Sequence, residues 1–214
     1  AWTNNGTFTP ANGTVTLNGG SANVNNGSGS FNNLTIDSTG TKTIITNRLD
    51  VNVRLTMTAG TLDLGSGFVG GSAHTVDGTV FPSVDINIGT LKLSTSELKV
   101  TSATGGVDIA ASSSAKIDMT ANSTADPDLD VEGNFIVNTG AQSGILDMTG
   151  SSASIDVAGS WTCNGTFNIG SSTVTLSGAT KNITTSGSSN FKNLRIIGTY
   201  TAQNALDIDG NMTI

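Results

Sequence analysis

The chain is built from short triplets in which two apolar residues flank one polar residue, as in Leu129, Asp130 and Val131. A period of two is typical of a β-strand, whose outer residues point to one side and whose middle residue points to the other. The triplets lie at residues 15–17, 34–36, 49–51, 55–57, 62–64, 84–86, 91–93, 98–100, 107–109, 117–119, 129–131, 146–148, 155–157, 167–169, 174–176, 194–196, 206–208 and 212–214. The pattern predicts many short strands with an apolar inner face and a polar outer face.

Clusters of Gly, Asn and Ser separate these triplets. Such residues supply the positive φ angles and the side-chain hydrogen bonds that a turning backbone needs. No stretch keeps a 3.6-residue period, and the 27 glycines would weaken helix interiors. We therefore predict an all-β chain.

A nine-residue phrase occurs four times. Residues 129–137, 155–163 and 206–214 match position for position, and residues 49–57 match without the glycine. In chain order the copies begin 80, 26 and 51 residues apart, close to multiples of a unit of about 26 residues. A longer echo has a 159-residue offset: Trp2, Gly6, Thr7, Phe8, Val15, Leu17 and Gly19 return as Trp161, Gly165, Thr166, Phe167, Val174, Leu176 and Gly178.

Whole phrases that return in register favour a parallel β-solenoid (β-helix), in which each coil stacks on the one before it. We expect about eight coils of roughly 26 residues in a single domain spanning residues 1–214. An antiparallel β-sandwich is the alternative, because it also uses short strands at close spacing. The regular spacing of the triplets is interrupted near residues 65–82 and 121–128, and these two segments are expected to be irregular loops.

Residues 1–4 align with residues 211–214, so we expect the chain to hold a whole number of coils with uncapped ends. An open end coil exposes apolar side chains and a row of unpaired backbone groups. Either the sequence is a window of a longer tandem array, or the end coil of one copy docks on the first coil of the next, and head-to-tail contacts that do not close on themselves produce filaments. The predicted self-assembly interface comprises Trp2, Phe8, Leu206, Ile208, Met212 and Ile214.

The charge balance excludes several partners. The net charge of −7 disfavours nucleic acid and anionic lipid, and no apolar run is long enough to span a membrane. The sequence also contains many Asn-X-Ser/Thr triplets, which would carry N-glycans in a cell with that pathway and favour an extracellular location. These candidate glycosylation sites are Asn5, Asn12, Asn26, Asn33, Asn122, Asn164, Asn182 and Asn211.

Aspartate dominates the outward positions of the triplets. It occupies them at Asp50, Asp63, Asp85, Asp108, Asp118, Asp130, Asp147, Asp156 and Asp207. Stacked carboxylates would attract calcium, whereas aspartates interleaved with Thr and Lys would serve solubility. Asp126, Asp128 and Asp130 form the tightest acidic group and are the candidate site for weak calcium binding. We expect no other cofactor.

We predict no enzymatic activity and no catalytic residues. A triad would have to use the single histidine, His74, which lies in a Gly-rich segment without a local catalytic signature. Cys163, the single cysteine, reads as a small buried residue. Most aromatic residues fall on repeat positions that belong to the core rather than to a sugar-stacking surface.

Residues 2–8 (WTNNGTF), 13–19 (GTVTLNG) and 31–36 (FNNLTI), and again residues 161–167, 173–178 and 191–196, resemble repeats in large secreted surface proteins of bacteria and archaea. The resemblance covers about half of the chain, and residues 66–128 depart from it. It implies a β-solenoid adhesin, filament or sheath protein without catalytic residues.

Repeat and resemblance together predict a structural subunit of an extracellular filament, sheath or surface layer that stacks end to end on copies of itself. The alternative is a stalk or binding segment of a cell-surface adhesin, in which residues 65–82 or 121–130 contact surface glycans.

Overall fold

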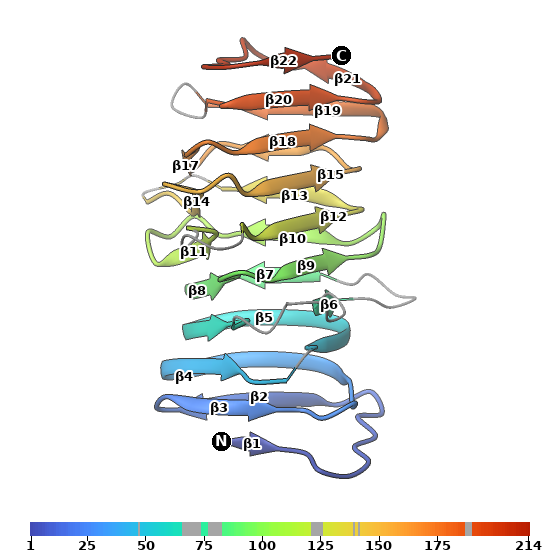
Figure 1. Cartoon of the computed structure of the whole chain (residues 1–214), viewed down its shortest axis with the longest axis vertical. Coiled ribbons are helices and arrows are strands. Elements are labelled where there is room, and N and C mark those ends of the chain that lie inside the picture. The colour runs from blue at the N-terminus through green and yellow to red at the C-terminus, as the bar shows by residue number, and fades with distance from the viewer. Residues whose placement is uncertain are drawn as a thin grey trace.

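The protein is an elongated rod of short parallel strands stacked along its long axis, as the computed structural model shows (Figure 1). The structure describes residues 1–46, 48–65, 74–76, 83–120, 126–138, 140, 142–186 and 190–214. Within these ranges the chain forms strands and turns and no helix. Every strand pairing in the described residues is parallel, so the β-solenoid of about eight coils is confirmed and the antiparallel sandwich is excluded.

Three parallel ladders run along the rod, and we name each by a strand that belongs to it alone. The β1 ladder contains β1 (Trp2–Thr3), β3 (Ala22–Asn25), the ends of β4 (Phe31–Ile44) and β5 (Asp50–Asp63), β8 (Gly89–Lys92), β11 (Ala115–Asp118), β14 (Ile145–Asp147) and β17 (Thr166–Asn168).

The β2 ladder contains β2 (Thr14–Gly19), the middle of β4 and β5, β7 (Ser83–Ile86), β10 (Gly106–Ile109), β13 (Asn134–Val137), β16 (Trp161–Cys163), β19 (Ala179–Thr185) and β21 (Thr199–Ala202). The β6 ladder contains the starts of β4 and β5, β6 (His74–Val76), β9 (Glu97–Val100), β12 (Asp128–Val131), β15 (Ser154–Val157), β18 (Thr173–Leu176), β20 (Asn193–Ile196) and β22 (Met212–Thr213). Each coil passes from the β6 ladder to the β2 ladder and then to the β1 ladder.

The outer residues of each triplet stack in columns inside the rod. In the β2 ladder, Leu55 lies over Leu34, and Trp161 lies over Phe135. All four side chains are fully buried. Each apolar residue is therefore covered by its equivalents in the neighbouring coils, which is why one coil has no core of its own.

The predicted 26-residue unit holds only in the middle of the chain. Leu129 pairs with Ile155 as predicted, but in the same ladder Leu194 pairs with Met212, 18 residues on, and Val100 with Val131, 31 residues on. The copy at residues 206–214 is thus out of register, because Met212 takes the position that the repeat assigned to Leu206. The nine-residue phrase forms a strand, a corner and a second strand, and such a unit can form more than one of the corners of a coil.

The alignment of residues 1–4 with residues 211–214 is also wrong. Trp2 pairs with Val24 in the β1 ladder, whereas Met212 pairs with Leu194 in the β6 ladder. The expected loop at residues 65–82 is likewise interrupted by a strand, since β6 lies within it and pairs with β5 and β9. The rest of residues 66–82, like residues 121–125, lies outside the described residues.

Glycines stack at the corner between the β6 and β2 ladders. A Cβ atom on Gly133 would overlap the carbonyl of Gly105, one on Gly159 would overlap Gly133, and one on Gly198 would overlap Gly178. The corner is therefore too tight for any side chain. This close approach of coil on coil explains Gly133 and Gly159 in the copies at residues 129–137 and 155–163.

Substituting Gly159 by alanine is expected to lower the free energy of unfolding by about 2 kcal/mol or more, because the new methyl group forces two coils apart. Gly20→Ala is the matched control, since no atom lies within 4 Å of a Cβ there, and its effect should stay within about 0.5 kcal/mol. Urea unfolding followed by circular dichroism measures both. Equal effects of the two substitutions would contradict the glycine contact.

Candidate functional site

The six residues predicted for self-assembly lie at the two ends of the rod, which Figure 1 marks N and C. At the first coil, the ring of Trp2 packs against Phe8 and Phe31, with centroids 5.2 and 5.4 Å apart. Trp2 also lines a cavity of about 220 Å³ together with Leu17 and Val24. Thr16, Asn18, Asn23 and Lys42 also line it, so the first coil presents a hollow with both apolar and polar walls.

The last coil presents apolar side chains instead of a hollow. Met212 is 48% exposed and Ile214 is 88% exposed. Leu206 and Ile208 are partly buried against the core. In the described residues β22 pairs only with β20, so one edge of its backbone faces away from the rod.

The outward aspartates are shared among the three ladders and interleaved with other residues. Three steps along the ladders place one aspartate directly beside another, and each has one basic side chain in ion-pair distance. These groups are Asp118 and Asp147 with Lys116, Asp85 and Asp108 with Arg54, and Asp130 and Asp156 with Lys99. The aspartates therefore form neither one continuous column nor a fully interleaved pattern, since six of them stand in three pairs of direct neighbours, and calcium binding stays a prediction.

The pKa values in these groups diverge. Burial raises the pKa of Asp147, but hydrogen bonds from Lys116 and Thr149 outweigh burial, so the pKa is lowered overall. Burial and the neighbouring Asp85 raise the pKa of Asp108. Burial likewise raises the pKa of Asp130, against the attraction of Lys99 at 3.9 Å. A cation close to the carboxylate decides the direction.

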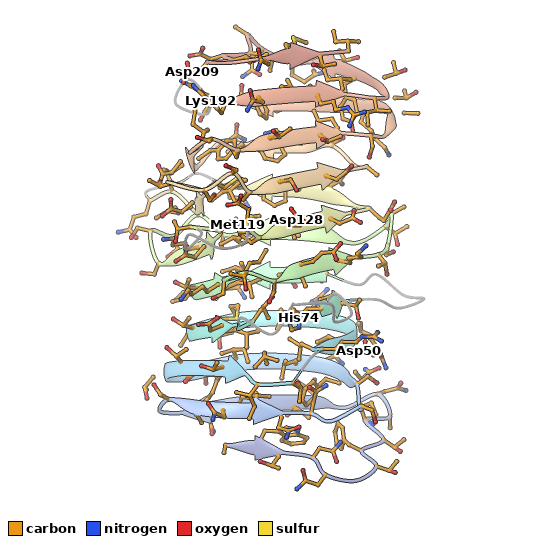
Figure 2. All side chains as sticks on the ribbon, in the orientation of Figure 1. Asp50, His74, Met119, Asp128, Lys192 and Asp209 are labelled. Atoms are coloured by element: carbon orange, nitrogen blue, oxygen red, sulfur yellow. The ribbon has the colours of Figure 1, made fainter. Side chains whose placement is uncertain are left out.

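The candidate calcium site does not assemble as a ligand group. Asp126 accepts a hydrogen bond from the Ser152 amide at 3.0 Å, and Asp128 accepts one from the Ser154 hydroxyl. Asp128 lies on the surface of β12 (Figure 2). Among the residues with described positions, no three His, Cys, Asp or Glu side chains are grouped to hold a metal ion. Weak calcium binding here stays a prediction without geometric support.

A polar groove crosses the middle of the β2 ladder. Arg54 Nε lies 3.1 Å from Asp85 Oδ2 and donates to the Ser83 hydroxyl at 3.1 Å. In the next coil, Asn138 donates to Asp108 at 2.5 Å. The groove is thus lined by fixed donors and acceptors that converge from four coils.

The groove exists because side chains are missing or small along one column. Gly106 stands between Ser83 and Asn134 in the outward column of the ladder. The resulting hollow has a volume of about 300 Å³. Our sequence analysis placed Asp85 and Asp108 on the surface but did not bring them together, because the coil between them is not 26 residues long. If residues 74–76 are counted as a further triplet, every third triplet from residues 49–51 to residues 117–119 belongs to the same ladder. This count pairs Asp85 with Asp108.

His74 is a core residue. Its side chain is 1% exposed, and its Nδ1 atom accepts a hydrogen bond from the Leu49 amide at 2.8 Å. Figure 2 places it in the coil that follows β5. Burial lowers the pKa of His74 to about 4, and the opposing interaction with the Leu64 backbone offsets only part of this shift. Cys163 is fully buried in β16, as predicted.

The structure separates the candidate glycosylation sites. Asn5, Asn12, Asn182 and Asn211 are exposed, Asn33 and Asn164 are partly buried, and Asn122 lies outside the described residues. Asn26 is 3% exposed, donates to the Gly29 carbonyl at 2.6 Å and accepts from the Thr46 hydroxyl at 2.9 Å. The prediction of a glycan on Asn26 is therefore wrong for the folded coil, because the amide is already used to close a turn.

The described part of the chain contains no helix of the length and apolarity needed to cross a bilayer. Comparison of the chain with protein-family models, with curated proteins and with solved structures found no match.

The buried state of His74 predicts a specific loss of stability in acid. The unfolded side chain has a pKa near 6.5 and the folded one a pKa of about 4, so the unfolded state binds the proton first. Stability is complete above pH 6.5 and falls as the pH drops toward 4, by about 3 kcal/mol from this group.

His74→Asn keeps an acceptor near the Leu49 amide but does not titrate. Urea unfolding at pH 7, 5.5 and 4 measures both proteins, and the difference between them isolates the histidine from the carboxylates. We expect the variant to be less stable at pH 7 and to lose less stability on acidification. The same pH dependence in both proteins would contradict a neutral buried His74.

Proposed function

We propose that this chain is a structural subunit of an extracellular filament, sheath or surface layer, in which β-solenoid coils stack end to end on copies of the same chain. The observation that carries the proposal is the exposure of inward-type side chains at the last coil, where Ile214 is 88% exposed. Its equivalent one coil earlier, Ile196, already packs against the core. A further coil on β22 would bury Ile214 in the same way.

The two end surfaces are complementary in kind. The first coil offers a hollow beside Trp2 whose walls include Leu17 and Val24 as well as polar side chains, and the last coil offers the projecting side chains of Met212 and Ile214. Burial of apolar surface stabilises by about 25 cal/mol per Å², and parallel strand edges add backbone hydrogen bonds without any new fold. Two different surfaces at opposite ends of a rod give a head-to-tail contact, which extends rather than closes.

The remaining features agree with a structural role outside the cell. The net charge of −7 repels nucleic acid and anionic lipid. Exposed Asn-X-Ser/Thr sites at Asn5, Asn12, Asn182 and Asn211 are accessible to N-glycosylation in a source with that pathway. The single histidine is buried as a structural residue, and we propose that the subunit has no catalytic activity.

Electron microscopy and light scattering of the purified 214-residue chain test the assembly. We expect fibres one solenoid wide, whose mean length grows with protein concentration. Ile214→Asp places a charge in the proposed contact and should shift the protein to monomers. Ile88→Asp is the matched control, because Ile88 is 49% exposed in the middle of the chain. Wild-type protein that stays monomeric at every concentration and salt condition would overturn the proposal.

A second candidate function is a stalk or binding segment of a cell-surface adhesin, and the polar groove favours it. Arg54, Asp85, Asp108 and Asn138 present donors and acceptors at fixed positions on a rigid sheet. Such an array suits the vicinal hydroxyl groups of a surface glycan, which both donate and accept hydrogen bonds. The segments predicted for this role, residues 65–82 and 121–130, lie largely outside the described residues.

A glycan array tests this candidate. We expect the wild-type chain to bind at least one class of neutral oligosaccharide, and Asp85→Asn with Asp108→Asn to weaken binding at least tenfold. Asp118→Asn with Asp147→Asn is the control, because these two aspartates form an equivalent pair on the β1 ladder, away from the groove. Absence of binding by the wild type, or equal loss in both double variants, would remove the groove from consideration.

A further inference from the structure

Three aromatic rings pack together at two places in the chain, and the two clusters have similar spacings between their ring centroids. They are Trp2, Phe8 and Phe31 in the first cluster and Trp161, Phe167 and Phe191 in the second. The ring centroids are 5.2, 5.4 and 6.0 Å apart in the first cluster. In the second they are 5.6, 5.5 and 6.2 Å apart in the same order. The sequence repeat with an offset of 159 residues therefore corresponds to a repeat in the structure.

The two copies of this unit face different sides of the rod. Trp2 pairs with Val24 in the β1 ladder, whereas Trp161 pairs with Ile183 in the β2 ladder. The strand that follows in each unit differs by one ladder in the same direction. Val15 pairs with Leu34 in the β2 ladder, and its counterpart Val174 pairs with Leu194 in the β6 ladder. Relative to the first unit, the second unit is therefore rotated about the rod axis by one of the three faces of the solenoid.

Within the chain, the second unit rests on the coil formed by β13, β14 and β15. Phe135 stacks under Trp161 with the ring centroids 4.8 Å apart and the planes at 15°. Leu146 lies under Phe167. Ile155 and Val157 lie under Val174 and Leu176. This internal interface shows which kind of surface the aromatic unit accepts beneath it.

The last coil repeats the order of that supporting surface. The triplets at residues 146–148 and 155–157 overlap β14 and β15, and the last coil carries the triplets at residues 206–208 and 212–214. Ala202 in β21 occupies the β2-ladder position that Phe135 occupies under Trp161. The small alanine leaves room for a larger ring above it. Tyr200, which donates to the Val157 and Gly159 carbonyls at 2.9 Å, fixes the strand that holds it.

We propose that a second copy of this chain docks on the last coil turned by one face about the rod axis, so that its β1 lies on β21 and its β2 on β22. This inference rests on the proposed end-to-end assembly and specifies its register. Trp2 of the second copy then covers Ala202, Phe8 covers the segment of Leu206 and Ile208, and Val15 and Leu17 cover Met212 and Ile214.

The turned register also continues the path of the coil. The chain passes from the β6 ladder to the β2 ladder, and β22 belongs to the β6 ladder. A following strand therefore belongs on the β2 ladder, which is where β1 of the second copy lies. Without the turn, β2 would lie on β21 and Val15 would cover Ala202, which leaves Met212 and Ile214 without the strand that matches them.

Engineered cysteines distinguish the two registers. Asp156 and Thr175 are Cα partners in the internal interface, and the corresponding pair between copies is Thr213 with Thr16. Adjacent strands lie about 4.8 Å apart, within the Cα separation of roughly 4.4–6.8 Å that a disulfide bridges. Thr16, Gln203 and Thr213 are exposed, so the substitutions leave the core intact. The native Cys163 is fully buried and does not interfere.

Wild-type-like fibres of Thr16→Cys with Thr213→Cys should give a ladder of covalent oligomers on a non-reducing gel after mild oxidation by copper phenanthroline. Thr16→Cys with Gln203→Cys, the pair that the unturned register brings together because Val15 then covers Ala202, should give none. A ladder from the second pair only, or fibres that neither pair crosslinks, would overturn the register while leaving the assembly standing. Monomers in the micrographs of both variants and of the wild type would overturn the assembly itself.

Discussion

Parallel backbone hydrogen bonds between successive coils hold this protein together, and the other features depend on them. Because each strand pairs with its equivalent in the next coil, the Ala158 amide meets the Val131 carbonyl at 2.9 Å and the residues above and below share one chemistry. Apolar columns then form the core. The same stacking forces the glycine corner, where a Cβ atom on Gly159 would overlap the coil beneath it.

Stacking also decides the electrostatics of the surface. A ladder places outward side chains at the spacing of the strands, about 4.8 Å, so two aspartates in sequence-equivalent positions repel each other. The chain resolves each such step with one basic side chain, as Lys116 does at 2.7 Å from Asp147. Where the cation is farther away, as at Asp108, the pKa of the carboxyl group is raised. A rod of low charge keeps its outer face soluble in this way.

A solenoid has two unlike ends, and function follows from what covers them. The hollow beside Trp2, with both apolar and polar walls, and the exposed Ile214 lie at the two ends of a fold in which each coil is stabilised by the coil that lies on it. In the proposed assembly, the duplicated aromatic unit specifies the register of that contact, because the last coil presents a surface like that of the coil under Trp161. The groove at Arg54 and Asp85 lies on the side of the rod, separate from its two ends.

The sequence by itself determined the strands, their inward and outward faces, and the parallel stack, because a period of two and a returning phrase are local properties. It also identified Cys163 as a core residue and the ends as apolar. The lengths of the individual coils were decided only by the tertiary structure, since turns of different length close the same three-sided path. Those lengths placed Met212 rather than Leu206 in the β6 ladder, brought Asp85 beside Asp108, buried Asn26, and drew His74 out of an expected loop into a strand. Which residues meet between neighbouring coils depends on the total number of residues that separate them along the chain. A local sequence pattern does not specify that number.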